Sequence, residues 1–237
     1  VPSKHELGDS CLFLFRIDQT DYFLYMPRSD DDPVTEFGLY RYVPLDDERW
    51  PRPDDVRYAI QVAYQLFEWY DRNRFCGRCG APTRPDRVER MLQCDACGNA
   101  IYPRINPCII VGIIDGDRLL LTRYINAQPE AWALVAGFTE VGETLEGTVE
   151  REVMEEVGLR VKNITYHTYQ PWPRSSSLLM GFFAELDGSP EISLDSSELD
   201  TACWMLPDEV PCERDAYSMT REMMAFFVEN HDRPEHA

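Results

Sequence analysis

Three carboxylates crowd onto a short stretch of predicted helix, and this feature constrains the chain more than any other. The helix is predicted over residues 144–157, and at about 100° per residue Glu152, Glu155 and Glu156 fall on one arc of it. The neighbouring arc carries apolar residues that we expect to face a core: Leu145, Val149, Val153 and Val157. The acidic arc is either a solvated helix face or a site for hard divalent cations, which favour clustered carboxylate oxygens.

The residues that flank this helix follow a fixed spacing. Gly137 ends a predicted strand, Thr144 can cap the helix, and Gly158 lies just past its last turn. A loop, a helix and a second loop would therefore hold the carboxylates rigidly beside a strand edge. Within the 23 residues 137–159, nine positions match one pattern: Gly137, Glu143, Arg151, Glu152, Val153, Glu155, Glu156, Gly158 and Leu159.

This pattern resembles the Nudix box, with every specified position filled. The resemblance implies that Glu152, Glu155 and Glu156 bind Mg²⁺ or Mn²⁺, and that one of them can also serve as the base. It implies that Arg151 and Glu143 orient these groups and do not themselves react. Metals in such a site bridge phosphate oxygens and activate a water for attack at phosphorus. A metal site here would also explain how a chain of formal charge −19 binds a polyphosphate.

Four of the eight cysteines stand in two C-x-x-C pairs that are separated by fourteen residues. The pairs are Cys76/Cys79 and Cys94/Cys97, and the glycine after each pair permits a tight turn beneath a metal. Four thiolates fill the tetrahedral shell of Zn²⁺, so one structural ion per chain is predicted. Buried structural thiols or a redox pair are the alternatives. Residues 72–104 contain seven Arg against three acidic residues, so a nucleic-acid-binding ribbon also stays open.

The composition is that of a globular protein with an acidic surface. Of the 237 residues 44% are hydrophobic, and 42 are acidic against 23 Lys and Arg. This balance argues against general electrostatic affinity for nucleic acid. No apolar run is long enough to span a bilayer, no secretion signal is recognisable, and the other four cysteines are scattered. These features predict a cytoplasmic protein with reduced thiols and no membrane partner.

The order of predicted elements divides the chain into three domains. We expect residues 1–73 to form a small α+β domain, residues 74–103 the zinc ribbon, and residues 104–237 a domain of mixed strands with two helices. The first domain has predicted strands at 11–17, 22–26 and 37–43 and a helix at 54–73. The last has a hairpin that turns at 115–117, strands at 131–137, 161–170, 178–186 and 201–206, and helices at 144–157 and 217–229.

Three further segments resemble the NADH pyrophosphatase branch of the Nudix hydrolases. Tyr102-Pro103-Arg104 follows the ribbon, Phe138 follows the first box glycine, and the segment QPWPRSSSLLM begins at Gln170. Its matches to the family signature are Gln170, Pro171, Trp172, Pro173 and Ser177, and its departures are Tyr169, Arg174, Ser175 and the extra Leu179. The resemblance implies an α+β protein whose last domain is a Nudix α/β/α sandwich with a mixed sheet.

The resemblance also implies a reaction, the metal-dependent hydrolysis of the pyrophosphate in NAD(H) to nicotinamide mononucleotide and AMP. The segment ELDTACW is similar to a family segment and nominates Glu198 as a further metal ligand, with Glu185 as the second choice. Phe138 and Tyr102 could hold a flat ring of the dinucleotide between them, with Tyr102 acting across the interface of a homodimer. The other expected substrate contacts are Gln170, Trp172, Ser177 and Thr220.

Two classes of alternative stay open. The same metal site would serve ADP-ribose, a dinucleoside polyphosphate or the NAD cap of an RNA, and RNA binding is expected only through such a cap. A nucleotide sensor or nucleic-acid-binding protein without enzymatic activity is the other class. The sequence disfavours this class because all the catalytic carboxylates of the box are present.

Overall fold

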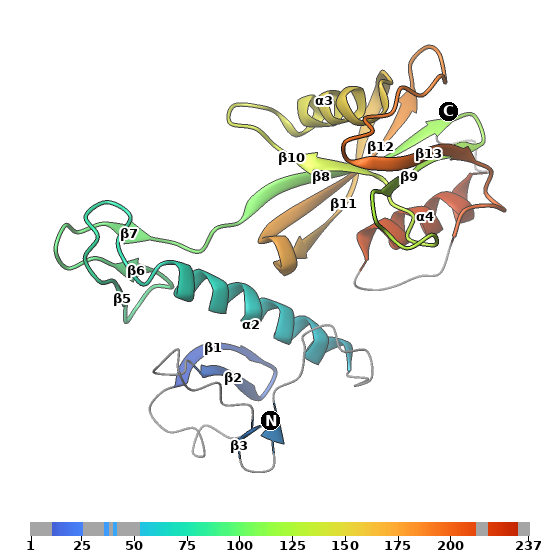
Figure 1. Cartoon of the computed structure of the whole chain (residues 1–237). Helices are drawn as coiled ribbons and strands as arrows, with labels where there is room; N and C mark the ends of the chain where they lie inside the picture. The colour runs from blue at the N-terminus through green and yellow to red at the C-terminus, as the bar shows by residue number, and fades with distance from the viewer. Residues whose placement is uncertain (1–10, 26–35, 38–39, 42–52, 212–217, 232–237) are drawn as a thin grey trace. The chain divides into compact units, whose positions relative to one another are not determined.

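The structure, a computed structural model, describes residues 11–25, 36–37, 40–41, 53–211 and 218–231. The chain divides into two compact units, whose elements are labelled in Figure 1. The first unit comprises Val1–Arg104 with Pro173–Ser175, and the second comprises Ile105–Trp172 with Ser176–Ala237. The predicted N-terminal domain and ribbon fall in one unit, and the division into three domains stays a prediction.

The first unit has a hydrophobic cluster of its own. Its described elements are β1 (Cys11–Ile17), β2 (Thr20–Tyr25), β3 (Glu36–Phe37), β4 (Tyr40–Arg41), α2 (Asp54–Arg72), β5 (Arg84–Pro85), β6 (Leu92–Gln93), β7 (Ala100–Ile101) and the 3-10 turn η2 (Pro173–Ser175). Leu14 of β1, Leu66 and Trp69 of α2 and Leu92 of β6 are buried together, so the ribbon shares apolar contacts with the elements before it. The first two predicted strands are confirmed as the antiparallel pair β1 and β2, and the predicted helix is confirmed as α2. Much of the strand predicted at 37–43 lies outside the described residues.

The second unit is a mixed sheet with one helix on each face (Figure 1). Its elements are β8 (Asn106–Asp115), β9 (Arg118–Tyr124), β10 (Val135–Phe138), α3 (Leu145–Val157), β11 (Val161–Trp172), β12 (Ser177–Leu186), β13 (Leu199–Met205) and α4 (Met219–Asn230). The strands follow the order β11-β12-β8-β9-β13, and β10 pairs with β8. β12 runs parallel to β8, whereas the other neighbours are antiparallel. The predicted α/β/α sandwich is confirmed.

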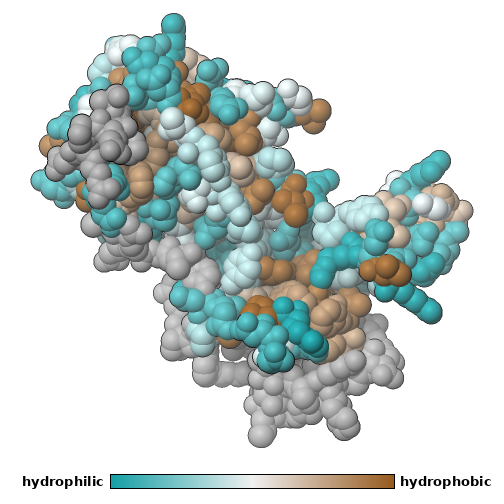
Figure 2. All heavy atoms as spheres, turned by 180° about the vertical axis from the view of Figure 1, so that it is seen from behind, coloured by the Kyte–Doolittle hydropathy of each residue, from teal (hydrophilic) through white to brown (hydrophobic). Residues whose placement is uncertain are grey.

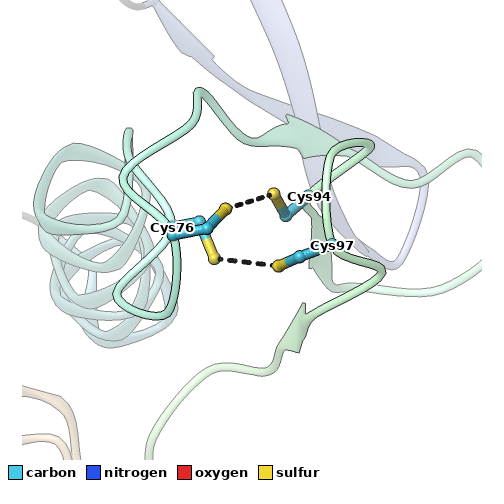
Figure 3. Close-up of side chains that lie close together, drawn as sticks. Cys76, Cys94 and Cys97 are labelled. Carbon is cyan, nitrogen blue, oxygen red and sulfur yellow. Dashed lines mark hydrogen bonds between the residues drawn. The ribbon is translucent and has the colours of Figure 1, made fainter.

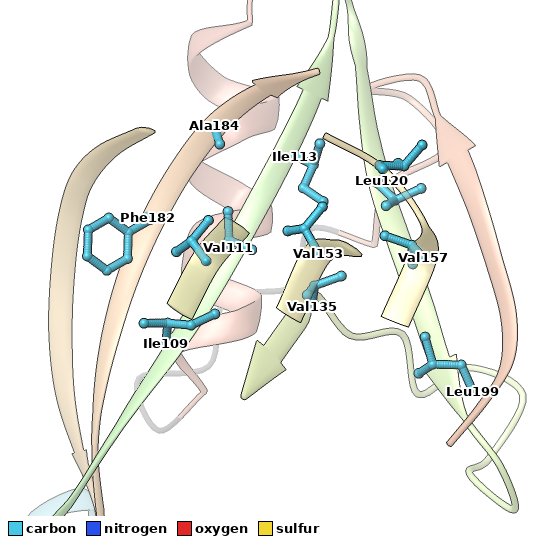
Figure 4. Packing of buried hydrophobic residues seen from close by; sticks show 12 residues of the cluster. Ile109, Val111, Ile113, Leu120, Val135, Val153, Val157, Phe182, Ala184 and Leu199 are labelled. Atoms are coloured by element: carbon cyan, nitrogen blue, oxygen red, sulfur yellow. The ribbon is translucent and has the colours of Figure 1, made fainter. Parts of the chain in front are cut away.

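Strand β8 shows why both faces of this sheet are covered. It is apolar almost without interruption, which is typical of a strand that is buried on both sides. Ile109, Val111 and Ile113 pack with Val153 of α3, as Figure 4 shows, whereas Ile110 packs on the side of α4. Because alternate residues of a strand point to opposite faces, one run of sequence serves two cores. The side chains of α3 that were predicted to face the core do pack into it: Leu145, Val149, Val153 and Val157.

Among the strands predicted in the second unit, the one at 131–137 differs most in extent from the observed strand. β10 covers only Val135–Phe138, which pairs with β8. Ala133 forms an isolated bridge to Thr122 of β9 instead, so the first part of this segment does not continue the ladder. The predicted hairpin turn is confirmed at Gly116, whose φ of 63° favours glycine.

The surface of the described residues mixes polar and apolar side chains. Figure 2 shows hydrophilic residues over much of one face, with hydrophobic residues among them. Two predicted substrate contacts are among the large exposed side chains: Phe138 is 51% exposed and Tyr102 is 56% exposed. Among the described helices, none is both long and apolar enough to cross a membrane.

Candidate metal-binding active site

Helix α3 begins and ends where the sequence predicts because both of its ends are capped. Thr144 Oγ1 accepts a hydrogen bond from the amide of Gly147 (3.0 Å), which satisfies a free N–H group of the first turn. At the other end Gly158 adopts the left-handed conformation (φ 68°), and its amide donates to the carbonyl of Met154 (3.2 Å). The two caps fix the helix and therefore the directions in which its carboxylates point.

Arg151 joins the loop before the helix to the helix itself. Its Nε and Nη2 donate to the two carboxylate oxygens of Glu143 at 2.7 and 3.0 Å, a bidentate pair. Its Nη1 donates to Glu152 (2.8 Å) and to Glu155 (3.0 Å), and its Nη2 also donates to the carbonyl of Phe138 (2.9 Å). One guanidinium thus holds two box carboxylates side by side.

Glu143 is the anchor of this guanidinium. It also accepts hydrogen bonds from the amide of Glu140 (2.9 Å) and from the hydroxyl of Thr148 (3.0 Å), a buried residue that the sequence did not single out. The hydrogen bond from Arg151, with that of the Glu140 amide, lowers the pKa of Glu143 to about 2. In return Glu143 raises the pKa of Arg151, so both groups stay charged. These contacts support the orienting roles predicted for the pair.

Glu152 lies directly against the backbone of Gly137. A Cβ atom on Gly137 would stand 1.9 Å from Glu152 Cδ and 2.0 Å from its Oε1. Only a residue without a side chain leaves room for the carboxylate there, so the box requires glycine at this position. Burial raises the pKa of Glu152, although the hydrogen bond from Arg151 opposes that shift.

Glu156 is the most deeply buried of the three box carboxylates. It is only 4% exposed, whereas the side chain of Glu155 is 59% exposed. Burial first, and then the charges of Glu152 and Glu198, raise the pKa of Glu156 to about 8, although the Ala136 amide opposes the shift. Among the described residues, its Oε2 has no hydrogen-bond partner. A divalent cation would satisfy this buried oxygen, and the clustered carboxylates suit Mg²⁺ or Mn²⁺.

Glu198 lies in the turn that leads into β13, and its side chain is exposed. Its charge raises the pKa values of Glu152 and Glu156, so it lies near these two carboxylates. Tyr124 of β9 pairs with Leu199, next to Glu198. Burial, and then the charge of Glu156, raise the pKa of its phenol. No motif or spacing in the sequence marks Tyr124.

Glu185 lies at a different level of the sheet. The box glycine Gly137 pairs with Ile109, and Ile109 pairs with Met180 of β12. Glu185 is five residues further along β12, which is about 16 Å at the usual rise per residue. There it accepts a hydrogen bond from Asn163 Nδ2 (2.9 Å). The strand register therefore favours Glu198 over Glu185 as the additional carboxylate.

The four predicted zinc ligands come together in the ribbon, and Figure 3 shows Cys76, Cys94 and Cys97 of this group. All four Sγ atoms lie within 4.8 Å of one another. Sγ of Cys76 is 3.7 Å from that of Cys97, and Sγ of Cys79 is 3.5 Å from that of Cys94. Zn–S bonds of about 2.3 Å in a tetrahedron place sulfurs about 3.8 Å apart. The four thiols therefore fit one structural Zn²⁺, with no position left for a substrate.

The two glycines of the ribbon behave as the sequence predicts. Gly80 and Gly98 adopt left-handed conformations, with φ of 75° and 71°. Their amides donate to the carbonyls of Cys76 and Cys94, both at 2.8 Å, and so close the two tight turns. The side-chain amide of Asn99 donates to Cys76 Sγ (3.6 Å), and such a bond stabilises a thiolate ligand.

Two of the predicted substrate contacts share one row of the sheet. Phe138 pairs with Cys108, Cys108 with Leu179, and Leu179 with Gln170. The row crosses four strands, so its ends lie about 14 Å apart at the usual strand spacing. Phe138 is exposed at one end and Gln170 is half-buried at the other. Between these ends Cys108 is buried and Leu179 packs against the core on the side of α4, so the row is not a continuous surface for a ligand.

The other predicted contacts are more scattered. Trp172 pairs with Ser177, which is buried, and Thr220 lies half-buried in the first turn of α4. Tyr102 belongs to the first unit, where its hydroxyl donates to Glu89 (2.8 Å). Substrate-binding roles for these residues stay predictions.

Family models match two parts of this chain. Residues 104–226 match the NUDIX domain, and residues 71–102 match the NADH pyrophosphatase zinc ribbon domain. The first match covers more than half of the chain, so the protein belongs to the Nudix family. Both matches agree with the predicted cofactors, a structural Zn²⁺ in the ribbon and catalytic Mg²⁺ or Mn²⁺ at the box.

Individual proteins and one solved structure are also similar to this chain. The chain is 48% identical over 147 residues to proteins named NAD-capped RNA hydrolase NudC from Salmonella typhi and Salmonella heidelberg (strain SL476). Each match covers 62% of this chain and 57% of the relative, less than two thirds of the relative's length. A NUDIX hydrolase structure from Nitrosomonas europaea shares the fold, with a TM-score of 0.56 at 24% identity over 67% of this chain and 92% of that chain.

Proposed function

We propose that this protein hydrolyses the pyrophosphate bond of NAD(H) to nicotinamide mononucleotide and AMP with Mg²⁺ or Mn²⁺. The observation that carries the proposal is the buried carboxylate of Glu156, whose Oε2 has no partner among the described residues and which lies with Glu152 and Glu198. When bound, the divalent ions would offset the negative charge of the pyrophosphate and lower the pKa of a bound water.

The residues of the chain have distinct tasks in this proposal. Glu152 and Glu156 supply fixed, partly or fully buried oxygens, and the exposed Glu155 is accessible to water. Arg151, held by Glu143, keeps two of these carboxylates in place without entering the reaction. Glu156 must lose its proton before it can bind a cation, and an ionised box carboxylate would accept the proton from the attacking water.

Three observations support a substrate that contains NAD. The ribbon matches a domain described as that of NADH pyrophosphatase, and the relatives from Salmonella are named for NAD-capped RNA. The segment that begins at Gln170 resembles the signature of the same branch. Phe138 follows the box glycine and is 51% exposed, which suits contact with a flat ring of a dinucleotide.

We also expect a homodimer in which Tyr102 of one copy contacts the ligand bound to the other. A residue that contacts the partner's ligand must be accessible in a single chain, and Tyr102 is 56% exposed. Light scattering coupled to size-exclusion chromatography measures the mass in solution. A protein that is monomeric and fully active at the assay concentration would contradict this expectation.

Product analysis tests the proposed reaction. Purified protein is incubated with NADH, NAD, ADP-ribose and diadenosine polyphosphates, each with Mg²⁺ or Mn²⁺, and the products are separated by chromatography. We expect AMP and nicotinamide mononucleotide to form fastest from NADH or NAD, and chelation to stop the reaction. Faster hydrolysis of ADP-ribose or a diadenosine polyphosphate would keep the metal site but reject the substrate, and no hydrolysis would favour a sensor.

A pair of variants tests the carboxylates. Glu155→Gln preserves size and removes the charge, and we expect it to abolish turnover while the melting temperature stays unchanged. Glu150→Gln is the matched control, because Glu150 is an exposed carboxylate on the same helix outside the cluster. Retained activity in Glu155→Gln, or equal loss in both variants, would refute the assignment.

Removal of the NAD cap from RNA is the second candidate, because it is the same cut and the relatives carry that name. The comparison is kcat/KM for NADH against that for a short RNA with a 5′ NAD cap. A clear preference for the capped RNA would make decapping the main activity. Because the chain is strongly acidic, we expect the RNA body to add little affinity.

A further inference from the structure

We propose that Arg123 is a positioning residue, which holds the turn that carries Glu198 against the metal site through an ion pair with Asp200. This inference rests on the proposed function, because it assumes that Glu198 acts with the box carboxylates on a divalent cation. Arg123 lies outside every motif considered above, and Asp200 lies within the segment ELDTACW, where no role was assigned to it.

The turn before β13 has an ordered internal structure. Asp195 accepts hydrogen bonds from the amide (2.8 Å) and hydroxyl (2.7 Å) of Ser197, and its carbonyl accepts from the amide of Leu199 (3.1 Å). Glu198 stands at the exposed end of this turn. Its position relative to the cluster is therefore set by whatever fixes the turn.

One side of the turn is fastened to the box helix. The amide of Ser193 donates to the carbonyl of Val157, and the amide of Asp195 donates to the carbonyl of Glu156, both at 2.9 Å. These bonds join the segment to the last turn of α3, where free carbonyls need partners. They fix the beginning of the segment and leave its far end, with Glu198, to be held by another element.

The far end of the segment is joined to β9 at a β-bulge in β13. Leu199 pairs with Tyr124 and Thr201 pairs with Arg123, so Asp200 is an extra residue in β13. A bulge bends its strand and turns nearby side chains to a new direction. Just before it, the carbonyl of Glu198 accepts a hydrogen bond from the amide of Ile125 (3.0 Å).

All three guanidinium nitrogens of Arg123 donate hydrogen bonds, and two of them donate to residues of the bulge. Its Nε and Nη2 donate to Asp200 Oδ2 at 3.2 and 2.7 Å, and Nη2 also donates to Thr201 Oγ1 at 3.1 Å. Its Nη1 donates to the carbonyl of Pro129 (3.2 Å), and the guanidinium lies 5.3 Å from the ring centre of Trp132. The Arg123 side chain is only 22% exposed, whereas that of Asp200 is 53% exposed, so solvent screens the pair mainly from the carboxylate side.

The arrangement explains how an exposed carboxylate can act at a defined place. Glu198 is held from α3 through one end of its turn and from β9 through the other, and the bulge sets its direction. Residues that orient a metal ligand typically contribute 10- to 100-fold, in order of magnitude, to metal affinity. The planar fork of arginine suits this task better than lysine.

Strand β9 provides a matched control. Arg118, at its other end, pairs with Asp115 and lies 5.5 Å from the ring centre of Trp204, so it too combines a carboxylate and an indole. We compare Arg123→Gln with Arg118→Gln, and measure calorimetric Mn²⁺ binding without substrate, the Mn²⁺ concentration for half-maximal activity, and the melting temperature. We expect Arg123→Gln to weaken Mn²⁺ binding about tenfold, and Arg118→Gln to leave it unchanged at a similar change in melting temperature.

The combination with Glu198→Gln decides between a positioning and a structural role. If Arg123 acts through Glu198, Arg123→Gln has no further effect on Mn²⁺ binding once Glu198 is replaced. Additive effects, equal effects of Arg123→Gln and Arg118→Gln, or unchanged Mn²⁺ binding in Glu198→Gln would each overturn the proposal. Asp200→Asn provides the same test if Arg123→Gln fails to fold. The calorimetric measurement needs no dinucleotide, so failure of NAD(H) hydrolysis is distinguished from failure of this proposal.

Discussion

The contact between Gly137 and Glu152 allows one prediction to be worked out in detail. In Gly137→Ala the new methyl carbon would lie 1.9 Å from Glu152 Cδ, whereas carbon atoms pack about 3.5 to 4 Å apart. The carboxylate must therefore withdraw by about 1.5 Å or more, and it loses its 2.8 Å hydrogen bond from Arg151. Displacement of a catalytic group by about 1 Å can reduce a rate about 100-fold. We expect kcat to fall by at least that factor, which is about 2.7 kcal/mol.

The same substitution has little effect on stability, because only the end of a flexible side chain has to move. Alanine also restricts the unfolded chain, which offsets part of any strain by about 0.4 to 1 kcal/mol. The assay is AMP release from NADH at saturating Mn²⁺, together with thermal unfolding. Gly147→Ala is the control: it adds the same methyl group on α3, where the new atom would meet only Thr144 Oγ1 at 3.2 Å. Activity of Gly137→Ala within a factor of three of wild type would refute the packing argument.

Three further perturbations have defined outcomes. Burial raises the pKa of Glu156 from 4.5 to about 8, so between these pH values the folded metal-free protein keeps a proton that the unfolded chain loses. The melting temperature of the metal-free protein should therefore fall as pH rises across that interval, and Glu156→Gln should make it less dependent on pH. Cys94→Ser removes a buried ligand and should lower the zinc content, measured by mass spectrometry, from about one ion per chain to near zero. Gly158→Ala combines a φ of 68° with a contact of 2.6 Å to Ser193 Cβ, and should lower the free energy of unfolding by about 1 to 3 kcal/mol in urea.

The sequence was most informative where a structure depends on neighbours along the chain. The ends of α3 follow from Thr144 and Gly158, and the hairpin turn at Gly116 follows from local turn chemistry. The four cysteines converge because each pair already lies on one tight turn. These features require no knowledge of how the strands are ordered.

The sequence was less informative where the sheet brings distant segments together. The choice between Glu198 and Glu185 depends on strand register, which no local periodicity reveals. The pair of Arg123 and Asp200 joins residues that are 77 positions apart, and the bulge beside it has no sequence signature. The three box carboxylates share one predicted arc, yet Glu156 is buried and Glu155 is exposed, because the orientation of the helix on the sheet decides which edge of the arc faces inward.

The pairing of Arg151 with Glu143 also determines the net charge that the site presents to ions. Because this pair is neutral as a unit, the ionised site carries four negative charges, those of Glu152, Glu155, Glu156 and Glu198. Two divalent cations balance these charges before any ligand arrives. A pyrophosphate carries roughly one negative charge per phosphate, so it can be accompanied by one more divalent cation. The protein alone should therefore bind two ions, and a third only together with the dinucleotide.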